Sequence, residues 1–167
     1  WHALRKNRQN AVKDLGLIPA NASMKRMAAT DDWDDLSEEE KRYSDKRMSV
    51  YAGMVDAMDH HIGRLIQYLK ESGQYDNTVI IFTSDNGPAA SELPLLWIKA
   101  LGYNRDYETL GERYSYGTIG ASFGNAAASP LGHYEFHAGE GGIRVPLNIS
   151  GPEGGDSHRG RISHSRG

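Results

Sequence analysis

The sequence predicts an α/β protein, because a long amphipathic helix pattern is followed directly by a short run of apolar, β-branched residues. The helix pattern extends from Ser37 to Gly73, and the strand pattern covers residues 79–83. A helix, a tight turn and a buried strand form half of an α/β unit. The chain has 167 residues, of which 38% are hydrophobic and 25% charged, as is typical of about one globular domain.

The overall composition excludes several classes of function. Nineteen Lys and Arg against 22 Asp and Glu give a formal net charge of −3, too close to neutral for a nucleic-acid-binding surface. No apolar run approaches the ~18 residues that a membrane span requires. Because these residues include no cysteine, they contain no disulfide, thiolate metal site or cysteine nucleophile.

The two ends of the chain lead us to expect a piece of a larger molecule. The chain begins at Trp1 rather than Met, and it closes on a polar segment rich in Gly and Arg, residues 154–161. Its mean hydropathy of −0.62 is also low for a chain that must bury a core of its own.

Charge is segregated near the start of the chain. Residues 1–29 carry six basic residues against one acid, and residues 30–40 carry seven acids. Charge runs commonly face solvent, so we favour a solvated helix over a basic strip that docks a partner. We expect this first helix to extend up to Leu15, where Gly16 and Pro19 end it.

The strongest helix signal begins at Ser37. Ser37 and Glu40 fit a capping box, in which the hydroxyl accepts an N–H and the carboxylate reaches back to the first residue. Apolar residues then recur at spacings of three and four, as one buried stripe requires: Met48, Tyr51, Ala52, Val55, Met58, Ile62, Leu65, Ile66 and Leu69. Gly73 is a typical helix stop. The stripe needs a large surface to cover it, and little else in this chain supplies one.

The segment after the helix predicts a strand buried on both faces of a parallel sheet. Residues 79–83 are a continuous apolar run of strand length. A second candidate strand, residues 145–149, contains Pro146, which restricts it to an edge or to the start of a strand. Residues 88–142 show little periodicity and predict a long loop region with one short helix near Leu93–Leu101. Loops of this length are usually functional.

Ser84-Asp85-Asn86-Gly87 directly follows the predicted strand. In open α/β sheets, ligands bind outside the carboxyl ends of strands. A carboxylate beside a carboxamide oxygen suits Ca²⁺ or Mg²⁺ and not Zn²⁺ or copper. Gly87 lets the backbone turn sharply, so that both side chains can aim at one ion. Taken alone, the tetrapeptide is more often an ordinary turn.

Two histidine pairs are weaker candidates. His133 and His137 have the spacing of zinc ligands on a helix, but Pro130 and the neighbouring glycines argue against a helix there. His60 and His61 lie on the predicted long helix, where one exposed and one packed imidazole is the simpler interpretation. We therefore predict neither pair as a metal site.

The residues around the predicted strand closely resemble the sulfatase family. The resemblance runs from Tyr51 to Pro88 and includes the whole of Ser84-Asp85-Asn86-Gly87. Residues 140–146, Glu-Gly-Gly-Ile-Arg-Val-Pro, are similar to the family's second conserved stretch, and the residues between the two resemble bacterial arylsulfatases. Two long motifs in this order are a specific signal. Residues 1–167 thus resemble the C-terminal part of a sulfatase catalytic domain.

The resemblance implies an alkaline-phosphatase-like α/β fold, with a mostly parallel sheet flanked by helices. It also implies hydrolysis of aryl or other small sulfate monoesters. Sulfatases use a formylglycine nucleophile, made from the first residue of a Cys/Ser-x-Pro-x-Arg motif. This motif is absent from the chain, so the formylglycine is expected upstream and no catalytic residue is assigned here.

The resemblance further implies a divalent cation, usually Ca²⁺, held by two acids near the N-terminus of the family's domain and by a later Asp-Asn pair. By position, Asp85 and Asn86 match the later pair, and Mg²⁺ is the less favoured ion. The acids at 31–32 and 34–35 are rejected as the other ligands because they precede a helix cap rather than follow a strand. Those ligands are expected upstream.

One position departs from the family's pattern. Five residues before the Glu-Gly-Gly of the second motif, the family typically has a Lys that contacts the sulfate, and here that position is Glu135. A carboxylate would repel a sulfate dianion and could compete for the cation. Glu135 is therefore a candidate substrate-binding residue. Three explanations of the difference stay open: the protein handles its substrate differently, a nearby basic residue compensates, or the register of the resemblance shifts here.

Two other functions stay open on the sequence. A phosphonate or phosphate monoester hydrolase of the same superfamily shares the Asp-Asn pair. A degenerate, non-catalytic sulfatase-like binding module is the other, and Glu135 favours it. Turnover of a nitrophenyl sulfate compared with the matching phosphate ester distinguishes a sulfatase from a phosphate or phosphonate hydrolase. The upstream sequence distinguishes an enzyme from a binding module, because it shows whether a nucleophile motif is present.

Overall fold

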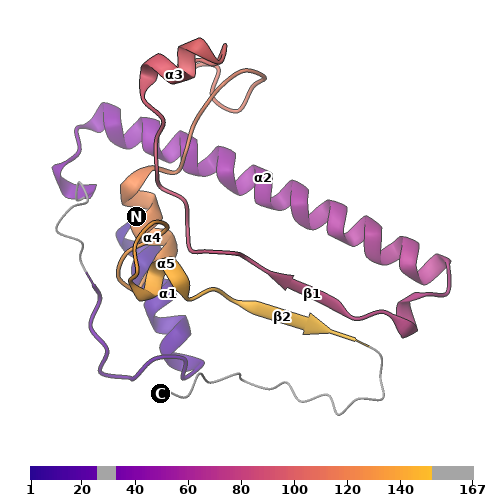
Figure 1. Cartoon of the computed structure of the whole chain (residues 1–167). Coiled ribbons are helices and arrows are strands. Elements are labelled where there is room, and N and C mark those ends of the chain that lie inside the picture. Colours follow the sequence, from indigo (N-terminus) through magenta and orange to yellow (C-terminus); the bar gives the residue numbers. More distant parts are fainter. Residues whose placement is uncertain (26–32, 152–167) are drawn as a thin grey trace. The chain divides into compact units, whose positions relative to one another are not determined.

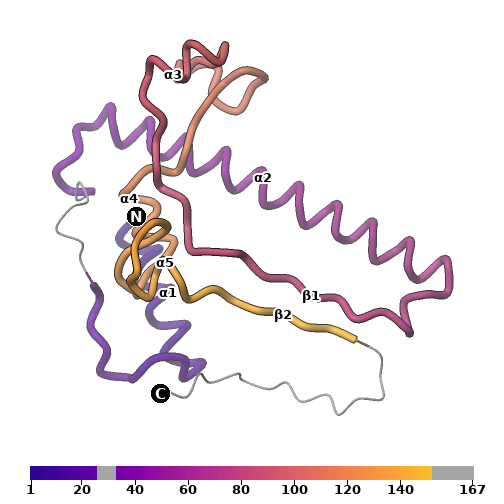
Figure 2. Tube along the Cα trace, viewed as in Figure 1, coloured from indigo at the N-terminus to yellow at the C-terminus, as the bar shows by residue number. Residues whose placement is uncertain are grey.

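The computed structural model describes residues 1–25 and 33–151, and the path of the chain is shown in Figures 1 and 2. The chain divides into two compact units. The first comprises Trp1–Asp56 and Ser84–Val145, and the second comprises Ala57–Thr83 and the described residues from Pro146 onward. Within the described residues, no helix is both long enough and apolar enough to cross a membrane.

The first unit is organised around a buried helix, α4, which spans Gly120–Ala128. The N-terminal helix α1, His2–Asp14, packs against α4, although the two are far apart in the sequence. Ile119, Phe123 and Ala126 form the buried centre of this core, and Trp1, Leu4, Trp33, Met48 and Ala127 pack around them. The core of the unit therefore joins the start of the chain to the long segment that follows the predicted strand.

The arginines of α1 are structural, so the prediction of a fully solvated basic helix is wrong for them. The Nε of Arg5, which is only 6% exposed, donates to the hydroxyl of Ser129 at 2.7 Å. Arg8 donates to the carbonyl of Ala126 at 2.7 Å, and burial lowers the pKa of its guanidinium. Cations near the last turn of a helix pair with its free carbonyls and with the negative end of its dipole.

The long helix α2 spans Glu38–Glu71, 34 residues or about 50 Å. The predicted capping box is confirmed, because the Ser37 N–H donates to the Glu40 carboxylate at 2.8 Å and the Glu40 N–H donates to the Ser37 hydroxyl at 3.3 Å. Gly73 ends the segment as predicted, with a left-handed φ of 69°. The apolar stripe is covered unevenly: Met48 packs on the core, whereas Met54 is 58% exposed.

The second unit contains the short helix η2, Tyr75–Asn77, and two strands, β1 at Ile80–Thr83 and β2 at Leu147–Ser150. The strands pair antiparallel, with Ile80 opposite Ser150, Ile81 opposite Ile149, Phe82 opposite Asn148 and Thr83 opposite Leu147. The described strands therefore do not form the mostly parallel sheet that was predicted. Strand β1 was predicted to be buried on both faces, but it is largely exposed. An apolar run predicts a strand, but it does not show whether the partner strand is parallel or antiparallel. Pro146 immediately precedes β2, as expected of a strand start.

Residues 88–142, all of which are described, hold more helix than the sequence predicts. The short helix α3, Leu95–Ala100, lies where it was expected. Helix α4 and the single-turn helix α5, Glu140–Ile143, were not predicted. Seven of the nine residues of α4 are buried, and a helix buried on every side shows no amphipathic period from which to predict it.

Candidate functional site

The loop that carries the predicted cation ligands begins directly after β1 and is held by local hydrogen bonds. The Ser84 hydroxyl donates to the Asn86 carbonyl at 2.8 Å, and the Asn86 N–H donates to Oδ1 of Asp85 at 3.1 Å. The Asn86 side-chain Nδ2 donates to the Gly87 carbonyl at 2.9 Å. Asp85 is exposed and Asn86 half-buried. Among the described residues, neither the second carboxylate oxygen of Asp85 nor the amide oxygen of Asn86 accepts a hydrogen bond.

These oxygens fit a hard divalent cation without completing its site. Carboxylate and carboxamide oxygens are the donors that Ca²⁺ prefers, and the ion takes roughly six to eight of them. Across the described ranges 1–25 and 33–151, no three His, Asp or Glu side chains are gathered so that they could hold a metal. Asp85 and Asn86 can therefore form only a part of such a site.

The structure brings the two sequence motifs together. The Gly87 N–H donates to the carbonyl of Gly142 at 2.8 Å, so the loop after β1 rests on helix α5. The contact is very close, because a Cβ on Gly87 would lie 1.9 Å from the carbonyl oxygen of Gly141. Only glycine allows this approach of two backbones. We call this contact the glycine clamp.

Glu135 is attached to the same loop through its backbone. Its N–H donates to the carbonyl of Pro88 at 3.1 Å, two residues beyond Asn86. The Glu135 side chain is half-buried, and among the described residues it has no ion-pair partner. The structure thus places the backbone of Glu135 beside the candidate cation loop.

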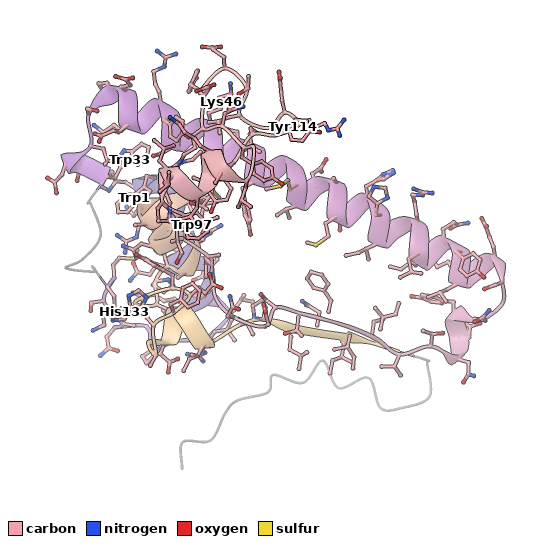
Figure 3. The ribbon with its side chains drawn as sticks, turned by 45° about the horizontal axis from the view of Figure 1, so that its top comes forward. Trp1, Trp33, Lys46, Trp97, Tyr114 and His133 are labelled. Atoms are coloured by element: carbon pink, nitrogen blue, oxygen red, sulfur yellow. The ribbon has the colours of Figure 1, made fainter. Side chains whose placement is uncertain are left out.

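The segment around Glu135, residues 133–137, is a strained loop and not a helix. His133 and Phe136 both have left-handed backbones, with φ of 72° and 67°. The imidazole rings of His133 and His137 stack with their centroids 5.1 Å apart. His133 lies near α5 (Figure 3). Residues 133–137 therefore do not form a helix, in agreement with the effect expected of the glycines around them.

The remaining candidates from the sequence lie elsewhere or play structural roles. His60 and His61 are both exposed on α2, so the expectation that one of them is packed is wrong. Asp34 and Asp35 lie in the short helix η1, Trp33–Asp35, where Asp34 is 2.8 Å from the His2 ring nitrogen. The acids at 31–32 fall outside the described residues.

A charged cluster that the sequence did not single out lies elsewhere in the first unit. Glu92 forms ion pairs with both Arg47 of α2 and Arg105. Burial lowers the pKa of the Arg47 guanidinium. Arg47 and Glu92 also line a cavity of about 670 Å³ whose walls do not include Asp85, Asn86 or Glu135. No sequence signal links these residues, because their partners are distant along the chain.

Comparison with known proteins assigns the family. The sulfatase family model matches residues 18–166, and the chain therefore belongs to the sulfatase family. Both motifs that form the glycine clamp lie inside the matched range.

The relatives agree with this assignment. The chain is 44% identical over 157 residues to an uncharacterized sulfatase of Schizosaccharomyces pombe, covering 89% of this chain and 28% of that protein. It is 30% identical over 161 residues to an arylsulfatase of Klebsiella aerogenes, covering 92% of this chain and 34% of that protein. A shorter match, 41% over 58 residues, covers 35% of this chain and 11% of a multifunctional alkaline phosphatase superfamily protein of Trinickia caryophylli. The chain thus spans about a third of the length of the first two relatives.

Proposed function

We propose that the whole protein hydrolyses aryl or other small sulfate monoesters, and that Asp85 and Asn86 supply two ligands of its Ca²⁺ site. The observation that carries the proposal is the glycine clamp, which holds the Asp-Asn loop against the second sulfatase motif. The similarity to an arylsulfatase supports the class of ester. The formylglycine nucleophile belongs, on this proposal, to a part of the protein outside these residues.

On this proposal, the roles of the cation, Asp85 and Asn86 follow from their charges. A bound divalent cation polarises the sulfate group and stabilises the charge that develops on it. Asp85 contributes the negative charge that attracts the ion, and Asn86 contributes a neutral oxygen held in place by its bond to Gly87. Ca²⁺ is favoured over Mg²⁺ because an exposed loop suits flexible coordination, whereas Mg²⁺ demands near-ideal octahedral geometry.

Replacement of Asp85 tests this proposal in the full-length protein. We expect Asp85→Ala to lower both Ca²⁺ affinity, measured by calorimetry, and kcat/KM for 4-nitrophenyl sulfate, by about 100-fold or more, or ~2.7 kcal/mol. Asp76→Ala is the matched control, since Asp76 also precedes an asparagine and is exposed. The isolated chain should bind Ca²⁺ weakly, if at all, and micromolar affinity there would contradict a two-ligand role.

A second candidate function is hydrolysis of phosphate or phosphonate monoesters. The match to a multifunctional alkaline phosphatase superfamily protein favours it, although that match covers a third of the chain. The same full-length protein should therefore be assayed with 4-nitrophenyl phosphate beside the sulfate. Faster turnover of 4-nitrophenyl phosphate than of 4-nitrophenyl sulfate would identify phosphate monoesters as the preferred substrates. Turnover of neither ester would indicate a non-catalytic module.

A further inference from the structure

The loop after β1 is held on both sides of the peptide group that joins Gly87 to Pro88. On one side, the Gly87 N–H donates to the carbonyl of Gly142 at 2.8 Å. On the other side, the carbonyl of Pro88 accepts the N–H of Glu135 at 3.1 Å. Both partners are backbone groups of one other segment, residues 132–142. The peptide group between the two bonds is therefore fixed from both ends.

The carbonyl of this peptide group orients the Asn86 carboxamide. The Asn86 Nδ2 donates to the Gly87 carbonyl oxygen at 2.9 Å. Only the nitrogen of a carboxamide can donate to a carbonyl, so the amide oxygen is the end that is turned away from Gly87. That oxygen is the atom that the proposed function assigns to the cation. The orientation of the candidate ligand therefore depends on the position of Gly87.

The position of Gly87 depends in turn on the close packing of Gly142. A Cβ on Gly142 would lie 2.3 Å from the carbonyl oxygen of His137 and 2.6 Å from that of Tyr134. Both contacts are with backbone atoms, which cannot rotate away as the end of a flexible side chain can. Any side chain at this position would therefore displace the Gly142 backbone, and with it the carbonyl that holds Gly87.

These contacts form a continuous path from the second motif to the candidate ligand, because Gly142 sets the position of Gly87 and Gly87 sets the orientation of Asn86. Groups that hold a metal ligand control metal affinity although they do not touch the ion. We propose that Gly142 is a positioning residue of the cation site, which raises the affinity for Ca²⁺ without supplying a ligand. This inference rests on the proposed function for the identity of the site.

Gly142→Ala in the full-length protein is the direct test. We expect the Kd for Ca²⁺, measured by calorimetry, to rise by about tenfold or more, as is usual when a group that holds a metal ligand is lost. A variant that is only destabilised would show fewer binding sites at the wild-type Kd. The kcat/KM for 4-nitrophenyl sulfate should fall at limiting Ca²⁺ and recover at saturating Ca²⁺.

Gly111→Ala is the matched control for loss of stability. Gly111 lies in the same unit, has a left-handed φ of 92°, and would place a Cβ 3.0 Å from a methyl carbon of Val50. The three atoms nearest to that Cβ all belong to Val50, so the strain does not reach the loop after β1 directly. We expect its Kd for Ca²⁺ to equal that of the wild type. An unchanged Kd in Gly142→Ala, or an equal rise in both variants, would overturn the inference.

Asn86→Asp tests the same path without disturbing the packing at Gly142. The two side chains have nearly the same shape, and the added negative charge by itself favours Ca²⁺. Aspartate, however, lacks the N–H donor and would place a carboxylate oxygen against the Gly87 carbonyl. We expect the Kd for Ca²⁺ to rise by about threefold or more. An unchanged or lower Kd would show that the Gly87 carbonyl does not orient the ligand.

Hydrogen exchange of the metal-free protein gives a measurement that requires neither Ca²⁺ nor turnover. Exchange over residues 84–88 should be faster in Gly142→Ala than in the wild type, and unchanged in Gly111→Ala. The Asp85→Ala variant separates this inference from the proposed function. If Asp85→Ala leaves the Ca²⁺ affinity unchanged, the proposed function fails and this inference fails with it. If Asp85→Ala lowers the affinity and Gly142→Ala does not, this inference alone fails.

Discussion

At the scale of single residues, glycine decides how closely the two sulfatase motifs approach. Gly87 and Gly141 meet so closely that a single methyl group on Gly87 would overlap the facing carbonyl oxygen. The same residue type on α2 has no such role, because a Cβ on Gly63 would have nothing within 4 Å. One residue type thus serves as an obligatory contact in one place and as a replaceable helix residue in another.

The pair Gly87→Ala and Gly63→Ala tests this difference. We expect Gly87→Ala to destabilise the protein by about 2 kcal/mol or more, because the backbones must separate to admit the methyl group. Gly63→Ala should stabilise it by about 0.5–1 kcal/mol, since alanine favours an exposed helix. The readout is the midpoint of chemical unfolding of the full-length protein. Equal shifts in the two variants would show that Gly87 is not clamped.

At the scale of elements, the start of α2 and the whole of α4 contrast in what determines them. The start of α2 is local, since Ser37 and Glu40 satisfy each other's backbone groups within one turn. The hydrogen bond from the Ser37 hydroxyl, with that from its N–H, lowers the pKa of Glu40. Helix α4 has no such cap and is instead surrounded by Trp1, Trp33 and Met48.

The capping box predicts a pH dependence of α2 with a definite sign. Because the folded pKa of Glu40 lies below its ordinary value of 4.5, its stabilisation is present above that value and is lost as the pH falls through the lowered pKa. In a peptide of residues 35–71, circular dichroism should show that acidification lowers helicity more in the wild type than in Glu40→Gln.

Two further variants complete this prediction. Ser37→Ala should lower peptide helicity at neutral pH, by an amount equivalent to about 1 kcal/mol, the usual value of a serine N-cap. Glu39→Gln is the control, because Glu39 lies in the same turn but outside the capping box. If acidification lowers the helicity of Glu40→Gln and Glu39→Gln by the same amount, the pH dependence arises from the helix dipole alone and not from the capping box.

At the scale of the whole molecule, the described residues expose more large hydrophobic side chains than they bury. Among the described residues, 22 large hydrophobic side chains are exposed and only seven hydrophobic residues are buried. The exposed ones include Met58 and Leu65 of α2, and Ile81 and Phe82 of β1. Where exposed apolar residues are contiguous, they ordinarily mark a surface that binds another part of a protein or a partner.

We therefore expect the isolated chain to be poorly folded. A dye that reports exposed apolar surface should bind strongly, and thermal melting should be broad rather than cooperative. The same measurements on the full-length protein provide the comparison, and there the dye should bind weakly. A sharp transition of the isolated chain, together with a monomeric elution volume, would instead identify an autonomous domain.

The sequence by itself determines the features that arise from neighbouring residues. The capping box at Ser37, the end of the helix at Gly73 and the strand of β1 depend on contacts within a few positions, and the structure confirms them. The two motifs, Tyr51 to Pro88 and residues 140–146, together indicate the family, because the residues of each are contiguous in the chain, and the family match confirms the resemblance. The assignment of Asp85, Asn86 and Glu135 to a site stays a prediction.

Only the tertiary structure decided what depends on distant residues. Burial of Arg5 against Ser129, the antiparallel partner of β1 and the glycine clamp each join segments that are far apart in sequence. Sequence periodicity reports one face of one element, so it cannot predict a helix buried on all sides such as α4. Sequence periodicity also does not predict whether a partner strand is parallel or antiparallel, or which backbone contact a glycine permits. These properties come from packing, which depends on which distant segments meet.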